Sequence, residues 1–228
     1  MSEHILEKDY GLSQEQLNKF EKFCDFLLEN NKRFNLTAIR EKDAVYVKHF
    51  LDSLKGLEFF SEDCKILEVG SGGGFPSVPL KIANPNFNLT LVEATGKKCV
   101  YLNQVKELLG FENFEVINSR CEELVNKGFR EKFDLVTARA VASLNVLLEL
   151  CVPFLKVGAK CVFYKNYSLS EIDEAQNALT KLGCKIVSVN EYTLYSESEK
   201  RCILIIQKTS KTPEIYPREY KKILKNPL

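Results

Sequence analysis

The sequence predicts an α/β fold, in which a seven-stranded and mostly parallel sheet follows a helical cap at the N-terminus. Three observations predict this class. Strand and helix patterns alternate after Cys64, a glycine-rich turn joins the first strand to a helix, and the residues before it have helical periodicity. We expect three parts, which are a helical extension at 1–60, an α/β core at 61–209 and a basic tail at 210–228.

The helical extension is predicted from two amphipathic patterns. Ser13 and Gln16 fit a capping box, which begins a helix that runs to Asn30. Its apolar residues recur at spacings of three and four, so they lie on one face. A second helical pattern covers Lys42 to Phe60.

The core is predicted from seven strand patterns with helical patterns in most of the gaps. The expected strands are Lys65–Val69, Asn88–Glu93, Phe114–Asn118, Phe133–Thr137, Ala159–Tyr164, Lys185–Tyr192 and Cys202–Gln207. The expected helices are Pro76–Ala83, Lys97–Leu109, Cys121–Asn126, Leu144–Leu155 and Ser170–Leu182. Only the polar connector Tyr195–Lys200 separates the last two strands, which suits a hairpin and makes the final strand antiparallel.

The charge and cysteine content indicate where the protein works and what it can contact. The formal net charge is +1, so the whole chain is not basic, although six basic and two acidic side chains follow Gln207. Such a tail is either a solvated surface or an RNA contact. The eight cysteines contain no Cys-x-x-Cys pair, which favours free thiols in a reducing cytoplasm over disulfides or a metal site. We expect a cytoplasmic protein, since a signal peptide and a long apolar run are both missing.

The glycine loop after the first strand is the main candidate for ligand binding. Gly70, Gly72 and their neighbours allow positive φ and close approach of a ligand, and Pro76 suits the first turn of a helix. In parallel α/β sheets this position binds nucleotide-like ligands. Neither register of a Gly-x-Gly-x-x-Gly pattern is complete, because the third glycine would fall at Phe75 or Ser77. This favours a nucleoside ligand without phosphates, such as S-adenosylmethionine.

Acidic residues at two further strand ends fit the same ligand. Glu93 ends the second strand, 19 residues after Gly74, where an acid can accept hydrogen bonds from ribose hydroxyls. The alternative is a solvent-facing acid. Cys121 and Glu122 follow the third strand, beside the expected base, although an acidic first turn is also favoured by the helix dipole alone.

Arg139 is the leading candidate for the reaction centre. It leaves the fourth strand, where such a sheet places its reacting groups, and a half-buried arginine needs an anionic or planar partner. The alternative is a salt bridge that holds the loop.

The chain has two histidines, and no serine or cysteine has a visible base partner. Methyl transfer to an atom with a free lone pair, such as guanine N7, needs alignment and electrostatics but no base.

Six segments together resemble the bacterial 16S ribosomal RNA guanine-N7 methyltransferases of the glucose-inhibited division B (RsmG) type. They are Asn31–Ile39, His49–Leu54, Glu68–Pro76, Gly96–Lys98, Ser119–Glu123 and Thr137–Leu144. The resemblance implies a Rossmann-like class I methyltransferase that uses S-adenosylmethionine. The substrate it implies is N7 of the guanine at position 527 of 16S rRNA, in the 530 loop. We expect the enzyme to be a monomer that acts on the rRNA or on a small-subunit particle.

The resemblance also assigns site residues by motif position. Gly70 and Phe75 would line the cofactor site beside Gly72 and Glu93, and Cys121 and Glu122 would flank the adenine. Arg139 would contact the reacting region, and we expect it to contact the cofactor as well. The residues that would face RNA are Lys97, Lys98, Lys165 and Arg218. Two other functions stay open on the residues alone. They are an NAD(P)-dependent Rossmann oxidoreductase, which the glycine loop and Glu93 also fit, and a non-catalytic RNA-binding module.

Overall fold

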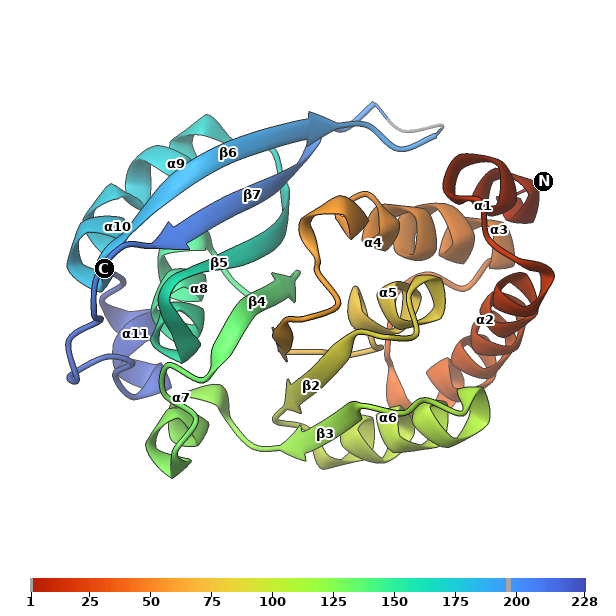
Figure 1. The fold of residues 1–228 in the computed structure, drawn as a ribbon, viewed down its shortest axis with the longest axis horizontal. Helices are drawn as coiled ribbons and strands as arrows, with labels where there is room; N and C mark the ends of the chain where they lie inside the picture. Colours follow the sequence, from red (N-terminus) through yellow and green to blue (C-terminus); the bar gives the residue numbers. More distant parts are fainter. Residues whose placement is uncertain (1, 196–197) are drawn as a thin grey trace.

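The computed structural model describes residues 2–195 and 198–228, and within these ranges seven strands form a single sheet (Figure 1). The spatial order of the strands is β3-β2-β1-β4-β5-β7-β6. Their bounds are β1 Lys65–Val69, β2 Asn88–Glu93, β3 Phe114–Asn118, β4 Phe133–Arg139, β5 Leu155–Asn166, β6 Cys184–Tyr192 and β7 Arg201–Lys208. All seven strands that the sequence predicts are present.

The first five strands are parallel, and β7 runs antiparallel to both β5 and β6. The predicted hairpin and antiparallel last strand are therefore confirmed, and residues 196 and 197 of its connector lie outside the described residues. β5 begins at Leu155 rather than at Ala159. Its extra residues are mostly exposed and lie at an irregularity in the β4–β5 register, so they carry no alternating apolar pattern.

Helices cover both faces of the sheet, as repeated β-α units require. The α-helices are α1 Ser2–Tyr10, α2 Gln14–Phe34, α3 Lys42–Val45, α4 Asp52–Leu54, α5 Ser77–Ala83, α6 Gly96–Leu109, α7 Cys121–Leu124, α8 Leu144–Cys151, α9 Leu169–Glu174, α10 Gln176–Leu182 and α11 Tyr220–Lys225. Two of them, α1 and α11, are absent from the sequence expectations. In the described part of the chain, no helix is long and apolar enough to span a bilayer.

The N-terminal helices confirm one prediction and refine another. Ser13 caps α2, and its side chain forms the expected reciprocal capping box with Gln16. The single helix expected from Lys42 to Phe60 is divided into α3, a π-helical turn at Tyr46–Leu51, α4 and a 3-10 turn. Wide turns of this kind are frequent at functional sites, and this one belongs to the segment that contacts Arg139.

Two apolar cores lie on the two faces of the sheet. One joins the N-terminal helices α1 and α2 with α5, α6 and one face of β1 and β2. The other joins α8, α10 and α11 with the opposite face. The helical extension thus shares its core with the sheet, and it holds residues 48–53 against the carboxyl end of β4. The division of the chain at residue 60 stays a prediction.

Candidate cofactor and acceptor site

The glycine loop between β1 and α5 has the backbone that the sequence predicts. Gly70, Gly72 and Gly74 all have positive φ, which an L side chain rarely adopts. A Cβ atom on Gly70 would lie 2.7 Å from Cγ2 of Val141, so the loop packs without a gap against the segment that follows β4. The loop forms a cradle that only glycine permits.

Glu93 joins the end of β2 to this loop. One carboxylate oxygen accepts a hydrogen bond from the backbone N–H of Gly72 at 2.9 Å, and the other accepts one from Thr95 at 2.7 Å. The side chain is 7% exposed and lines a cavity. Because each carboxylate oxygen has a second lone pair, Glu93 fits a ribose, whose hydroxyls need acceptors.

The cavity beside Glu93 measures about 130 Å³ and lies at the carboxyl ends of β1 to β4. It is lined by Val69, Gly70, Val92, Glu93, Ala94, Ser119, Arg120, Cys121, Glu122, Val141, Leu150 and Tyr220. Four residues that the sequence predicts for the cofactor therefore meet here, and Gly72 is tied to them through Glu93. Three other residues of the lining were not predicted from the sequence to bind the cofactor, namely Val141, Leu150 and Tyr220.

Cys121 and Glu122 form the polar part of the wall. The Cys121 thiol lies 3.6 Å from a carboxylate oxygen of Glu122 and donates to it. Burial, reinforced by the Glu122 charge, raises the pKa of Cys121 to about 12, so this thiol stays protonated. It therefore acts as a small apolar wall with a weak donor, which suits the edge of a purine.

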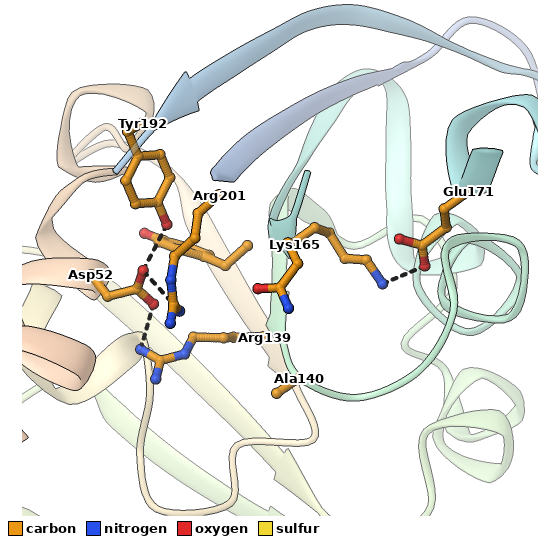
Figure 2. A pocket seen from close by; sticks show the side chains of 9 residues that line it. Asp52, Arg139, Ala140, Lys165, Glu171, Tyr192 and Arg201 are labelled. Atoms are coloured by element: carbon orange, nitrogen blue, oxygen red, sulfur yellow. Dashed lines mark hydrogen bonds and ion pairs between the residues drawn. The ribbon is translucent and has the colours of Figure 1, made fainter. Parts of the chain in front are cut away.

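A second cavity of about 350 Å³ lies at the carboxyl ends of β4 and β5 (Figure 2). It is lined by Asp52, Arg139, Ala140, Tyr164, Lys165, Asn166, Glu171, Tyr192 and Arg201. Arg139 and Ala140 line this cavity and Val141 lines the first one, so the exit loop of β4 contributes to both cavities. Residues from α4 and from the β6–β7 hairpin thus line one candidate acceptor site together with the ends of β4 and β5.

Arg139 is held in this cavity by the N-terminal segment. Its Nη1 lies 2.9 Å from a carboxylate oxygen of Asp52, and its Nη2 donates to the carbonyl of Lys48 at 2.9 Å. Weaker bonds reach the carbonyl of His49 and the hydroxyl of Ser53. The geometry supports the alternative of a salt bridge that anchors the loop, and direct contact of Arg139 with the reacting atoms stays a prediction.

His49 is a neutral acceptor for Arg139. Its Nδ1 lies 2.6 Å from Nη2 of Arg139 and 3.1 Å from the carbonyl oxygen of Lys48. Because Arg139 can only donate, the shorter contact makes Nδ1 an acceptor, so Nε2 carries the proton and donates to Oγ1 of Thr37 at 2.7 Å. Burial, together with the Arg139 charge, lowers the pKa of His49 to about 3. This tautomer positions Arg139 and excludes His49 as a general base in this arrangement.

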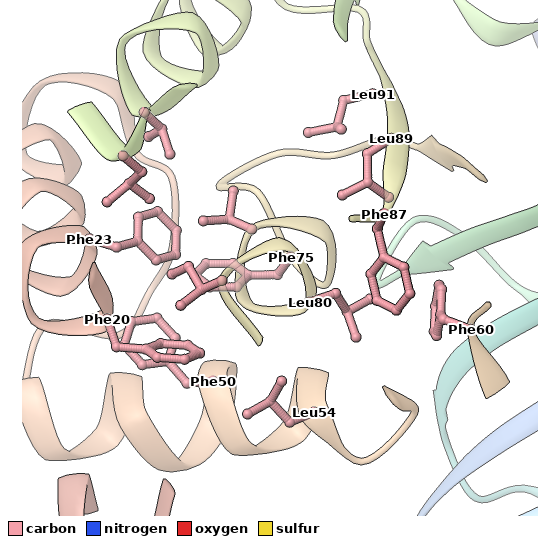
Figure 3. Close-up of a cluster of buried hydrophobic side chains, with 14 of the residues drawn as sticks. Phe20, Phe23, Phe50, Leu54, Phe60, Phe75, Leu80, Phe87, Leu89 and Leu91 are labelled. Carbon is pink, nitrogen blue, oxygen red and sulfur yellow. The ribbon is translucent and has the colours of Figure 1, made fainter. Parts of the chain in front are cut away.

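Phe75 supports the glycine loop from the side of the N-terminal helices (Figure 3). Its ring stacks on His49 with centroids 4.3 Å apart and packs against Phe23 and Phe50. Arg139 lies over the same ring at 5.5 Å. The ring does not line the first cavity, and its predicted contact with the cofactor stays a prediction.

Asp52 connects the β6–β7 hairpin to the site. Its carboxylate, 1% exposed, accepts a hydrogen bond from the Tyr192 hydroxyl at 2.7 Å and lies 3.4 Å from Arg201. The β6–β7 hairpin is thereby fixed to α4 and to Arg139 (Figure 2). Asp52 is not among the predicted site residues, although it lies in the His49–Leu54 segment of the family resemblance.

Glu68 is a buried acid on β1, beneath the glycine loop. Burial raises the pKa of this carboxyl to about 8, although the neighbouring Ser77 and the charge of Arg139 act against the rise. Neither carboxyl oxygen has a hydrogen bond of good geometry to the described residues. The neutral form of this carboxyl is therefore favoured at pH 7.

The four residues predicted to face RNA differ in their surroundings. Lys97 is exposed and Lys98 half-buried at the start of α6. Lys165 lies in the second cavity, where it pairs with Glu171 at 2.6 Å and donates to the carbonyl of Ala142. Arg218 pairs with Glu149 instead, as described below. RNA contact by these four residues stays a prediction.

The fold first defines the class of protein. A methyltransferase from Pyrococcus furiosus superposes with a TM-score of 0.57 at 17% identity, over 85% of this chain and 99% of that chain. M. jannaschii TYW2 in complex with AdoMet superposes with a TM-score of 0.55 at 15% identity, over 70% of this chain and 76% of that chain. The fold is that of the Rossmann-like class I methyltransferases.

The sequence then defines the family. The family model for GidB, rRNA small subunit methyltransferase G, matches residues 16–200. The ribosomal RNA small subunit methyltransferase G of Caldanaerobacter subterraneus subsp. tengcongensis is 44% identical over 92% of this chain and 89% of that protein. The protein of the same name from Lactobacillus acidophilus is 41% identical over 95% and 94%. The chain belongs to the rRNA small subunit methyltransferase G family.

The predicted family, fold class, enzyme class and cofactor are therefore confirmed, and the oxidoreductase alternative is not favoured. The residues at the first cavity suit S-adenosylmethionine in their chemistry, because they combine a glycine cradle, a carboxylate that can accept from ribose hydroxyls and the Cys121–Glu122 wall. When bound, the cofactor supplies a methyl group on a positively charged sulfur. The chain itself binds and orients the two reactants.

Proposed function

We propose that this protein methylates N7 of a guanine in 16S rRNA, with S-adenosylmethionine as the methyl donor. The observation that carries the proposal is the pair of cavities lined by consecutive residues of one loop, Arg139 and Ala140 in one cavity and Val141 in the other. One cavity offers the groups that bind a nucleoside cofactor, and the other offers polar groups at the carboxyl ends of β4 and β5. This arrangement allows direct transfer between two bound reactants, for which alignment is the main requirement.

The second cavity supports guanine as the acceptor. On its major-groove edge guanine presents two acceptor atoms, N7 and O6. N7 has to stay free for attack, so the donors of the cavity would bind O6 and the rest of the nucleotide. Candidate donors are Asn166, Lys165 and Arg201. Because N7 already has a lone pair, no group needs to remove a proton.

Ion pairs fix the shape of the second cavity before the acceptor binds. The buried carboxylate of Asp52 is held by Arg139, Arg201 and Tyr192, so these groups need no reorganisation during transfer. Because two arginines share this carboxylate, Asp52 offers no net negative charge to the methylated guanine, which is a cation. Alignment of the two reactants is therefore the contribution that these residues supply.

The surface around the cofactor cavity supports an RNA substrate. Lys97 and Lys98 begin α6, directly after the end of β2 that carries Glu93. Lysines in this position can neutralise phosphates while the target base enters the second cavity. We propose that the enzyme is a cytoplasmic monomer and that its substrate is the rRNA or the small-subunit particle.

Transfer of isotope from labelled S-adenosylmethionine tests this function. Purified protein is incubated with 16S rRNA and, separately, with small-subunit particles that lack the modification, and the RNA is digested to nucleosides. The expected product is labelled 7-methylguanosine from at least one of the two substrates. Label in another nucleoside, or none in either RNA, contradicts the proposal.

A further inference from the structure

The last nineteen residues form an ordered strap over α8 and not a free tail (Figure 1). Arg218 donates three hydrogen bonds to Glu149 of α8, through its backbone N–H at 2.9 Å, its Nε at 2.8 Å and its Nη2 at 2.6 Å. Ile223 of α11 and the terminal Leu228 are buried in the core around α8. The strap is therefore anchored at its middle and at its end.

The anchor lies directly beside the cofactor cavity. Glu149 is fully buried, and the next residue on α8, Leu150, lines the cavity. A buried carboxylate is costly unless it is paired, so Arg218 and Glu149 hold each other in place. This pair fixes where the residues after Arg218 lie.

Tyr220 is the residue that the strap brings to the cavity. It lines the cavity together with Arg120, whose guanidinium carbon lies 5.6 Å from the centre of the Tyr220 ring. Of the described residues in the lining, Tyr220 is the one with an aromatic ring, while Val141 and Leu150 supply aliphatic surface. A cation over an aromatic ring restricts how the ring can turn.

We propose that Tyr220 is a binding residue for the adenine of the cofactor, and that the C-terminal strap completes the cofactor site. The inference deepens the proposed function and rests on its cofactor pocket. A purine has two flat π faces, and an aromatic side chain that stacks on one contributes to affinity whatever hydrogen bonds the base makes. The ring contacts Arg120, the residue directly before Cys121 and Glu122, beside which the base is expected.

Three single variants separate stacking from simple packing. Tyr220→Phe keeps the ring, and Tyr220→Leu keeps an apolar side chain but loses the π face. Leu224→Ala changes a 52% exposed side chain on the same helix and serves as the matched control. Affinity for S-adenosylhomocysteine is measured by calorimetry, and thermal unfolding of each apo protein reports whether α11 is still docked.

We expect the Leu variant to bind S-adenosylhomocysteine about tenfold more weakly than wild type, while the Phe variant and the control stay within about twofold. In steady-state methylation the KM for S-adenosylmethionine should rise in the Leu variant, with little change in the KM for RNA. Equal affinity of the Leu and Phe variants overturns the proposal. A wild-type protein that fails to bind S-adenosylhomocysteine overturns the cofactor pocket itself.

A photolabel provides a test that needs no variant, should Tyr220→Leu fail to fold. An 8-azidoadenosine analogue of S-adenosylhomocysteine is bound to the wild-type protein and irradiated, and the labelled peptides are mapped by mass spectrometry. We expect label on Tyr220, protected by excess S-adenosylhomocysteine. Protected label that is confined to other residues contradicts a contact between Tyr220 and adenine.

Discussion

The guanidinium of Arg139, at the end of β4, lies 2.9 Å from the carboxylate of Asp52, which is 1% exposed at the start of α4. This ion pair joins the N-terminal helices to the strand end between the two cavities. The same carboxylate holds Tyr192 of β6 and Arg201 of β7. The shape of the second cavity therefore depends on one buried acid, Asp52, which contacts β4, β6 and β7.

Replacing Asp52 by Asn should be strongly destabilising. The change leaves Arg139 and Arg201 near one another without their buried counter-ion, and breaking one partner of a buried ion pair costs about 3–5 kcal/mol. Urea denaturation measures this loss, with Asp63→Asn, an exposed acid before β1, as the matched control. A double-mutant cycle with Arg139→Gln should show coupling, and additive effects would mean that the pair contributes no interaction energy.

His49 should remain neutral throughout the pH range in which the enzyme works. The folded-state pKa is lowered to about 3, so the unfolded chain binds a proton below about 6.5 that the folded chain does not. Stability from this group is present above pH 6.5 and is lost as the pH falls towards 3. An NMR titration of the imidazole nitrogens should show Nε2 protonated and no transition above about pH 5. A transition near 6.5 would contradict the bond from Arg139 to Nδ1.

Glu68 should make the stability of the fold depend on pH in the opposite direction to His49. Its folded-state pKa is raised to about 8, so the folded chain keeps a proton that the unfolded chain loses above about 4.5. The protonated Glu68 carboxyl contributes fully to the free energy of unfolding below the pKa of about 4.5 that it has in the unfolded chain. This contribution declines by at most about 1.4 kcal/mol per pH unit between there and pH 8. Glu68→Gln mimics the neutral acid and removes this dependence.

The measurement for Glu68 is the difference in unfolding free energy between Glu68→Gln and wild type at several pH values. The variant should gain stability relative to wild type as the pH rises from 5 to 8. A difference that does not change over this range would show that the carboxyl is ionised in the folded protein. Because only differences are compared, other titrating groups cancel.

Glu93→Ala should weaken cofactor binding without unfolding the protein. The change removes the ribose acceptor and releases the backbone of Gly72 and Thr95, so we expect at least about tenfold weaker binding of S-adenosylhomocysteine. Glu107→Ala, an exposed acid on α6, is the control and should leave affinity unchanged. Equal affinity of the Glu93 variant and wild type would remove Glu93 from the cofactor site.

The double variant Lys97→Ala/Lys98→Ala should bind rRNA more weakly and with a lower dependence on salt. Each phosphate contact that is lost should reduce the slope of log affinity against log salt by about 0.7–0.9. Lys181→Ala, at the exposed end of α10, is the control. Filter binding over a range of salt concentrations gives both slopes, and an unchanged slope would show that these lysines contact no phosphates.

Much of the fold and part of the site could be predicted from the sequence. Strand and helix periodicity located all seven strands, since each is an apolar run bounded by turn residues. Gly70, Glu93, Cys121 and Glu122 meet in one cavity because they follow parallel strands, whose carboxyl ends share one edge of the sheet. These predictions depend only on local pattern and on the topology of parallel sheets.

The remaining features depend on contacts between distant segments. Asp52 gains its role from Arg139 and Arg201, which lie far along the chain and leave no mark on its local pattern. The tail has the composition of a solvated segment, yet Arg218 and Ile223 anchor it to α8 and bring Tyr220 to the cavity. Tertiary packing thus overrides the local propensity of this segment.

The most direct test of the account is a mass map of 16S rRNA from cells with and without this gene. One guanine should carry a methyl group at N7 only when the gene is present. Wild-type protein should restore this methyl group in the deletion strain, and Glu93→Ala should restore it poorly. Identical 16S rRNA maps from the two strains would contradict the proposed function.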